Sequence, residues 1–155
     1  MLSLIKTLVV NASLVLASLS AALFLAACDV AWTNGKTHTV LYDTGGWIQW
    51  YVNHVEDLKR RGIKPQLRGK HDSAATMLLG VPGVCVHPTA RFGFHGSIPV
   101  LPGETKDYGD NLMRQYYKPA LQDWYDKHAR HLQIVTEELT GQELHDKFGY
   151  DLCPV

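Results

Sequence analysis

The chain has 155 residues with 15 basic and 15 acidic side chains, so its formal net charge is zero at pH 7. This balance offers no basic surface of the kind that binds polyanions, and we expect no nucleic-acid partner. There is no internal repeat, and removal of the first 27 residues would leave roughly 130 residues, enough for one domain and too few for two.

The first 27 residues have the pattern of an export signal. Lys6 precedes an uncharged, largely apolar stretch from Leu8 to Ala27. This stretch could also span a bilayer, so an uncleaved anchor is the alternative. Leu25-Ala26-Ala27-Cys28 resembles a bacterial lipobox, in which the signal is removed and Cys28 becomes the lipidated first residue. We therefore expect a lipid-anchored protein on the periplasmic side of the bacterial cell envelope.

The cysteine count agrees with an oxidising compartment. If Cys28 carries lipid, Cys85 and Cys153 remain as a pair that could form a disulfide between the C-terminal tail and the core. Three separate thiols are the alternative. Residues 28–38 are expected to form a polar tether, and residues 39–155 the folded domain.

Strands and helices alternate at the start of the domain. Thr39 to Asp43 predicts a strand, and Trp47 to Arg61 has apolar residues at helical spacing before Gly62. Ile63 to Leu67 predicts a second strand, in which Pro65 indicates a sheet edge. This order predicts a parallel α/β sheet with right-handed crossovers and a ligand site beyond the carboxyl ends of its strands.

The stretch from Asp72 to Gly96 contains a candidate catalytic pair. Ser73 stands before small residues and an apolar run, which predicts the start of a buried helix, and the run from Ala90 predicts a strand that ends at His95. A serine hydroxyl becomes a good nucleophile when an imidazole within hydrogen-bond reach takes its proton. The N–H groups of a helix start could stabilise the oxyanion. The alternative is an N-cap serine and a structural histidine.

A third element lies upstream, where an apolar strand runs into Gly45-Gly46 and then a helix. Such a turn can present an unshielded backbone N–H to a substrate carbonyl. With Gly-Gly, Ser73 and Ala90-Arg91 before His95 in this order, the chain resembles the Clp protease proteolytic subunit and crotonase superfamily. It is more closely similar to the small periplasmic Clp-protease-like proteins. The tail from Thr136 to Tyr150 is similar to the closing element of that family.

The resemblance implies a truncated single domain with the ClpP/crotonase-like parallel sheet and crossover helices. It implies a serine hydrolase or peptidase that acts on a peptide or protein substrate. In this reading Ser73 is the nucleophile, His95 is the general base, and the backbone N–H groups of Gly46 and Ala74 form the oxyanion hole.

The acidic third member of the family has no clean counterpart. The matching point falls at Thr136, and we name Glu137 for this role, while Asp107 and Asp110 are closer to His95 in sequence. The first strand and helix of the larger family are missing as well. A non-catalytic envelope protein that uses the fold for binding or assembly is therefore the rival function.

Two charged neighbours of the serine also bear on the chemistry. Asp72 replaces a small residue before Ser73, and its charge would oppose the developing oxyanion unless the side chain points away. Lys70 offers a serine–lysine dyad as a further alternative, which His95 makes unnecessary.

The C-terminal half predicts mainly helix. Ser97 to Asp110 reads as a loop, and a long helix is expected from about Asn111 to Leu132 with a kink at Pro119. Its aromatic stripe could pack in the core or in a homo-oligomer contact. His128 and His131 are spaced to share one metal, but the zinc-protease pattern is absent, so we expect no metal and no other cofactor.

Overall fold

The computed structural model describes residues 31–33 and 35–154, so the segment predicted to be an export signal and Cys28 lie outside the described residues. Its strands are β1 (Ala31–Thr33), β2 (Thr37–Asp43), β3 (Lys64–Asp72), β4 (Cys85–Val86), β5 (Arg91–Phe94), β6 (Glu137–Thr140) and β7 (Asp151–Leu152). Its helices are α2 (Ile48–Arg61), the 3₁₀ helix η1 (Ser73–Gly80), α3 (Lys106–Arg114), α4 (Pro119–His128) and α5 (Gly141–Phe148).

The sheet divides at β3, its central strand. On one side β3 pairs in parallel with β2. On the other side Gln66 and Leu67 pair with β4, and Lys70 to Asp72 pair with β5, both in parallel. β7 continues the sheet beyond β4, while β6 and β1 add antiparallel strands beyond β5 and β2. The expected parallel sheet is therefore a mixed one, with antiparallel strands at two of its edges.

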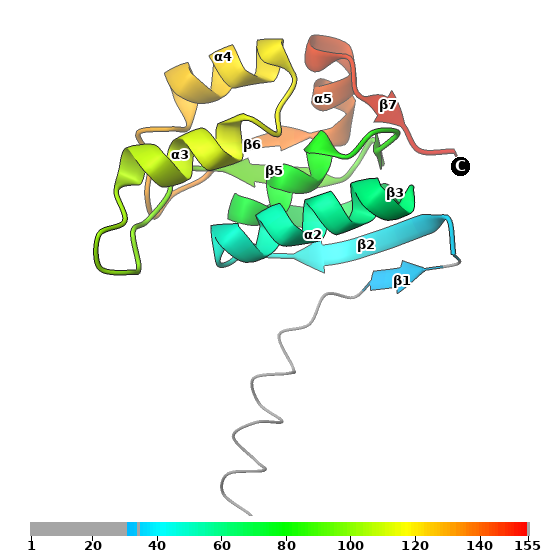
Figure 1. Cartoon of the computed structure of the whole chain (residues 1–155). Coiled ribbons are helices and arrows are strands. Elements are labelled where there is room, and N and C mark those ends of the chain that lie inside the picture. Colours follow the sequence, from blue (N-terminus) through cyan, green and yellow to red (C-terminus); the bar gives the residue numbers. More distant parts are fainter. Residues whose placement is uncertain (1–30, 34, 155) are drawn as a thin grey trace, which may run out of the picture.

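The helices pack around η1, which is almost wholly buried. Ala74 to Leu79 are all buried, and η1 contacts α2, α3, β3 and β5. Figure 1 shows α2 lying across β2 and β3, with α3 and α4 on the side of β5 and β6. Ser73 thus stands between the central strand and the most buried helix of the described chain.

β3 differs from the prediction in length and position. It runs to Asp72 and lies in the middle of the sheet, so the edge position inferred from Pro65 is wrong. Proline is tolerated because pairing with β4 begins only at Gln66, one residue later. In the range predicted to be a tether, Ala31–Thr33 instead pairs with residues 38–40 and satisfies its backbone in the sheet.

The predicted long helix is two helices. Thr105 caps α3 by accepting a hydrogen bond from the Tyr108 N–H, so helix starts within the range expected to be loop. Pro119 begins α4 instead of kinking a continuous helix, because the first turn of a helix needs no N–H donor from it.

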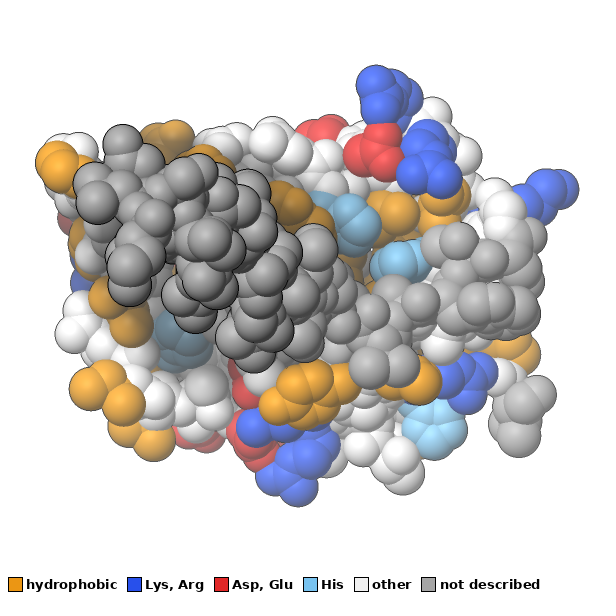
Figure 2. Space-filling view, turned by 90° about the horizontal axis from the view of Figure 1, so that it is seen from below, with side chains coloured by type: hydrophobic (Ala, Val, Ile, Leu, Met, Phe, Trp, Pro, Cys, Tyr) orange, Lys and Arg blue, Asp and Glu red, His pale blue; other side chains and the backbone are white. Residues whose placement is uncertain are grey.

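The described surface carries both signs of charge. The part of the lower face visible in Figure 2 has acidic and basic side chains side by side and no large field of one sign. Within residues 31–33 and 35–154, no helix is long and apolar enough to cross a membrane, and no cluster of three or more His, Cys, Asp or Glu side chains could hold a metal ion.

A disulfide joins Cys85 and Cys153, which lie 68 residues apart. It fixes β7 to β4, where the Cys153 N–H also donates to Val86 O at 3.0 Å. In a chain-entropy account, closing a loop of this size stabilises the fold by about 4 kcal/mol.

His71 makes stability sensitive to acid. The ring is fully buried in the sheet, stacked on Phe92 with centroids 5.2 Å apart. Burial lowers the pKa of His71 from 6.5 to about 4, against a smaller opposing effect of Asp43. As pH falls from 6.5 towards 4, the unfolded chain takes up a proton that the folded chain does not, so stability falls.

We predict that His71→Phe makes this acid loss smaller by about 3 kcal/mol between pH 6.5 and 4. Urea unfolding at a series of pH values measures the free energy of unfolding of both proteins. The slope of this free energy against pH is independent of any constant packing cost of the substitution. An unchanged pH slope in the variant would contradict the buried, neutral state of His71.

Candidate functional site

A cavity of about 540 Å³ lies at the carboxyl ends of β2, β3 and β5. Ser73, His95 and Gly46 all line it. These three segments are brought together from positions far apart in the sequence. The remaining wall is largely apolar and includes Trp47, Ile48, Ile98, Val100, Leu112 and Met113.

Ser73 has a strained backbone at the junction of β3 and η1. Among the described residues it alone, apart from glycines, has a positive φ, of 57°. This left-handed conformation costs a non-glycine residue about 1–3 kcal/mol, and such strained residues cluster at active sites and ligand clamps. A serine on a sharp strand-to-helix turn is also the geometry that exposes a nucleophilic hydroxyl.

The glycine turn packs directly against Ser73. A Cβ on Gly45 would lie 2.7 Å from Ser73 Cβ and 2.6 Å from Asp72 O, and Gly45 has a φ of 80°. Only glycine fits this position, because both the space and the backbone angle exclude a side chain.

Asp43 holds the glycine turn in place through a hydrogen bond to its backbone. Its buried carboxylate accepts the Gly45 N–H at 2.9 Å and the Tyr51 hydroxyl at 2.5 Å. Within the described chain the next N–H, that of Gly46, donates to no protein group. Sequence reasoning missed Asp43, although an aspartate two residues before a glycine is the pattern of an Asx turn.

Ala74 supplies a second backbone N–H beside the serine. It lies in the first turn of η1, where N–H groups have no partner within the helix. The Asp72 side chain makes no capping hydrogen bond to these groups. Ala74 follows Ser73 directly in the chain, and Gly46 lines the same cavity as Ser73.

His95 follows β5 directly, and one nitrogen of its ring is hydrogen-bonded to the backbone. Nδ1 lies 2.6 Å from the carbonyl oxygen of Gly96. A carbonyl only accepts, so in the neutral ring Nδ1 carries the proton and Nε2 is the nitrogen without one. This is the tautomer that a general base acting on a serine hydroxyl needs.

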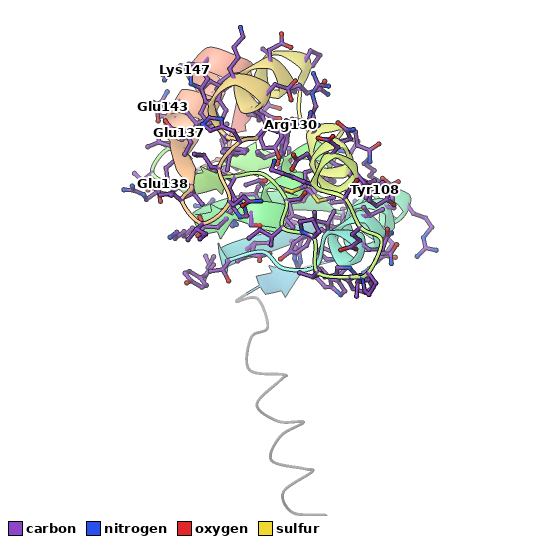
Figure 3. All side chains as sticks on the ribbon, turned by 90° about the vertical axis from the view of Figure 1, so that its left-hand side faces the viewer. Tyr108, Arg130, Glu137, Glu138, Glu143 and Lys147 are labelled. Carbon is purple, nitrogen blue, oxygen red and sulfur yellow. A yellow bond between two sulfur atoms is a disulfide. The ribbon has the colours of Figure 1, made fainter. Side chains whose placement is uncertain are left out.

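Glu137 does not line the cavity. It is an exposed residue of β6, opposite Phe94 in the β5–β6 register. Figure 3 shows Glu137 near Glu143 and Lys147, on the other side of the view from Tyr108, which lines the cavity. Ser73 and His95 therefore line one cavity, and Glu137 lies outside its lining.

The charged neighbours of Ser73 also lie outside the cavity lining. Asp72 forms an ion pair with Lys70, with 3.1 Å between Oδ2 and Nζ, and its Oδ1 lies over Gly93. The hydrogen bond and charge of Asp72 raise the pKa of Lys70, which keeps the amine protonated. Lys70 in this state cannot serve as a base for Ser73.

The other acids near His95 in sequence differ from each other. The Asp107 side chain is 86% exposed, whereas Asp110 is fully buried. Asp110 accepts the backbone N–H of Ser97 at 2.5 Å, two residues after His95. Sequence reasoning placed both residues in a loop and gave no signal for this contact.

One wall of the cavity is a loop fixed by Glu104. Its carboxylate accepts the N–H groups of Val100 and Leu101, each at 3.0 Å. These two bonds lower the pKa of Glu104, so it stays ionised and keeps the apolar loop in place at neutral pH. Glu104 thus ties this wall of the cavity to the backbone of its own loop.

Comparison with known proteins gives a fold and no closer relationship. No protein-family model matches the sequence, and no curated protein matches it. Among solved structures, the ClpP protease catalytic domain from Plasmodium falciparum is similar, with a TM-score of 0.57 and 15% identity over 79% of this chain and 70% of that chain. The ClpP-like part of the expected fold is confirmed, and the crotonase-like crossover arrangement is not. The chain has a mixed α/β, ClpP-like fold.

Proposed function

We propose that this protein is a serine hydrolase that cleaves peptides through an acyl-enzyme on Ser73. The observation that carries the proposal is the left-handed backbone of Ser73 at the floor of a cavity shared with His95 and the Gly46 turn. A side chain that merely capped a helix would not need this strained angle.

The reaction follows from the positions of these groups. Ser73 Oγ attacks the carbonyl carbon of the substrate while its proton passes to Nε2 of His95. The N–H groups of Gly46 and Ala74 stabilise the oxyanion. When the tetrahedral intermediate collapses, the C–N bond breaks and the leaving amine takes the proton from Nε2. Water then repeats the sequence on the ester, releasing the acid and restoring the Ser73 hydroxyl.

The cavity wall favours apolar side chains in the substrate. Three large hydrophobic side chains in this wall are exposed to solvent: Trp47, Ile98 and Val100. Peptides with an apolar residue at the cleaved bond would cover this surface, which water otherwise contacts at a cost.

Labelling with a fluorophosphonate probe tests the proposal. We predict covalent modification of the folded protein at Ser73, lost in Ser73→Ala and slowed by about 10²–10⁴-fold in His95→Ala, the usual range for a general base. Peptide mapping by mass spectrometry identifies the modified residue. A folded protein that the probe does not modify would favour the non-catalytic binding function.

The glycine turn supplies a second test. We predict that Gly45→Ala abolishes the labelling, because the added methyl group must push the turn away from Ser73. Gly35→Ala is the matched control: Gly35 has a similar φ, of 88°, but a Cβ there meets nothing within 4 Å. Both variants should lower the melting temperature, and only Gly45→Ala should stop labelling. Normal labelling of Gly45→Ala would argue against the turn as part of the site.

We also propose that the protein acts outside the cytoplasm, anchored by lipid on Cys28. The Cys85–Cys153 disulfide supports an oxidising compartment. Mass spectrometry of the intact protein from bacterial envelopes should find a chain that begins at a diacylated Cys28 with the disulfide formed. A mature chain that retains residues 1–27, or that begins elsewhere without lipid, would contradict the anchor.

A further inference from the structure

We propose that Asp110 is the positioning acid of the site, and that it acts on His95 through the Gly96–Ser97 peptide bond. The proposal rests on the serine hydrolase function proposed above. Glu137 does not line the cavity, and no carboxylate in the described chain contacts the His95 ring. Another group must therefore orient the imidazole.

The contacts on the two ends of one peptide group carry the proposal. The N–H of Ser97 donates to Asp110 Oδ1 at 2.5 Å, and the C=O of Gly96 lies 2.6 Å from His95 Nδ1. Both belong to the same planar amide, and the described chain contains no cis peptide bond. In a trans amide the N–H and C=O point in opposite directions, so carboxylate, amide and imidazole form one chain of hydrogen bonds.

Such a chain transmits charge as well as position. A carboxylate that accepts from an amide N–H increases the negative charge on the carbonyl oxygen of that amide, because linked hydrogen bonds polarise one another. The Gly96 oxygen then holds the Nδ1–H more strongly as His95 becomes an imidazolium. Asp110 therefore does indirectly what a triad acid does by touching the ring.

The residues around the amide leave it little freedom. The Gly96 N–H donates to Leu132 O at 2.8 Å, and a Cβ on Gly96 would lie 2.1 Å from Arg130 O. The Tyr125 hydroxyl lies 3.2 Å from His95 O and 3.4 Å from Asp110 Oδ1. Burial raises the pKa of Tyr125, so its hydroxyl stays a donor.

Two cations lie against the buried carboxylate of Asp110. Oδ2 of Asp110 lies 2.6 Å from Lys106 Nζ and 3.4 Å from Arg130 Nε, which leaves Oδ1 for the Ser97 N–H. A buried carboxylate needs such partners to offset its lost hydration. Figure 3 shows Arg130 between the Glu137 side of the molecule and Tyr108, above the sheet.

The close approach of α3 to the His95 turn also has a specific cause. A Cβ on Gly109 would lie 2.6 Å from Ser97 Oγ, so a glycine is required beside Asp110 for contact. Ser97 Oγ in turn donates to Lys106 O at 2.7 Å. The Ser97 side chain and its N–H thus both bind α3.

A double-mutant cycle tests the proposal by the rate of fluorophosphonate labelling. We expect Asp110→Asn to slow labelling about tenfold, because the transition state loses the stabilisation of roughly one hydrogen bond. Asp107→Asn, an exposed acid on the same helix, is the control and should leave the rate unchanged. In a His95→Ala background Asp110→Asn should have no further effect. An equal slowing in both backgrounds, or none in the parent, would overturn the proposal.

NMR of the parent protein tests the hydrogen-bonded link without labelling and without the Asp110→Asn variant. It therefore remains informative if that variant does not fold or if the protein is not a hydrolase. We expect the Ser97 amide proton to shift with pH at the same midpoint as the His95 ring protons, and to lose this step in His95→Ala. A Ser97 amide that stays unchanged while His95 titrates would overturn the coupling. Failure of labelling in the parent protein, with this coupling present, would count against the hydrolase function and not against the link.

Discussion

The left-handed turn at Ser73 is the constraint on which the rest of the site depends. It converts the central strand into a buried helix within one residue, and this forces Ser73 out towards the cavity while Ala74 onwards enters the core. Gly45 has to be a glycine because of that turn, since its backbone fills the space beside Ser73 Cβ. The strain is sustained by the sheet, in which β3 pairs with β2 up to His71 and with β5 up to Asp72.

The polar groups that hold the site are buried and matched. Asp43 fixes the glycine turn and Asp110 fixes the turn after His95, each by accepting a backbone N–H while its other contacts satisfy it. Burial of these acids costs stability unless every partner is present. Two carboxylates that never touch the cavity thus set where its backbone donors and its imidazole lie. The Cys85–Cys153 disulfide stabilises the pair of strands β4 and β7 and does not involve Asp43 or Asp110.

Much of this fold could be read from the sequence because periodic patterns and breakers are local. The strand before Gly45, the α2 helix ending at Gly62 and the strand ending at His95 were all predictable within a few residues. The central place of β3 was not, because pairing with β4 and β5 is a long-range property and Pro65 suggested the reverse. The convergence of Ser73, His95 and Gly46 was predictable from strand direction and a family resemblance. The acid was not, because Asp110 works through a backbone amide and nothing in its spacing from His95 signals that.

In the proposed reaction Ser73 attacks a carbonyl group held by the Gly46 and Ala74 N–H groups. A crystal structure of the protein treated with a peptidyl phosphonate would test it most directly. We expect a covalent bond from Ser73 Oγ to phosphorus, a phosphonyl oxygen about 2.7–3.1 Å from the nitrogens of Gly46 and Ala74, and His95 Nδ1 still bound to the Gly96 carbonyl. An inhibitor seated in the cavity with Ser73 unmodified, or with its phosphonyl oxygen turned away from both N–H groups, would contradict it.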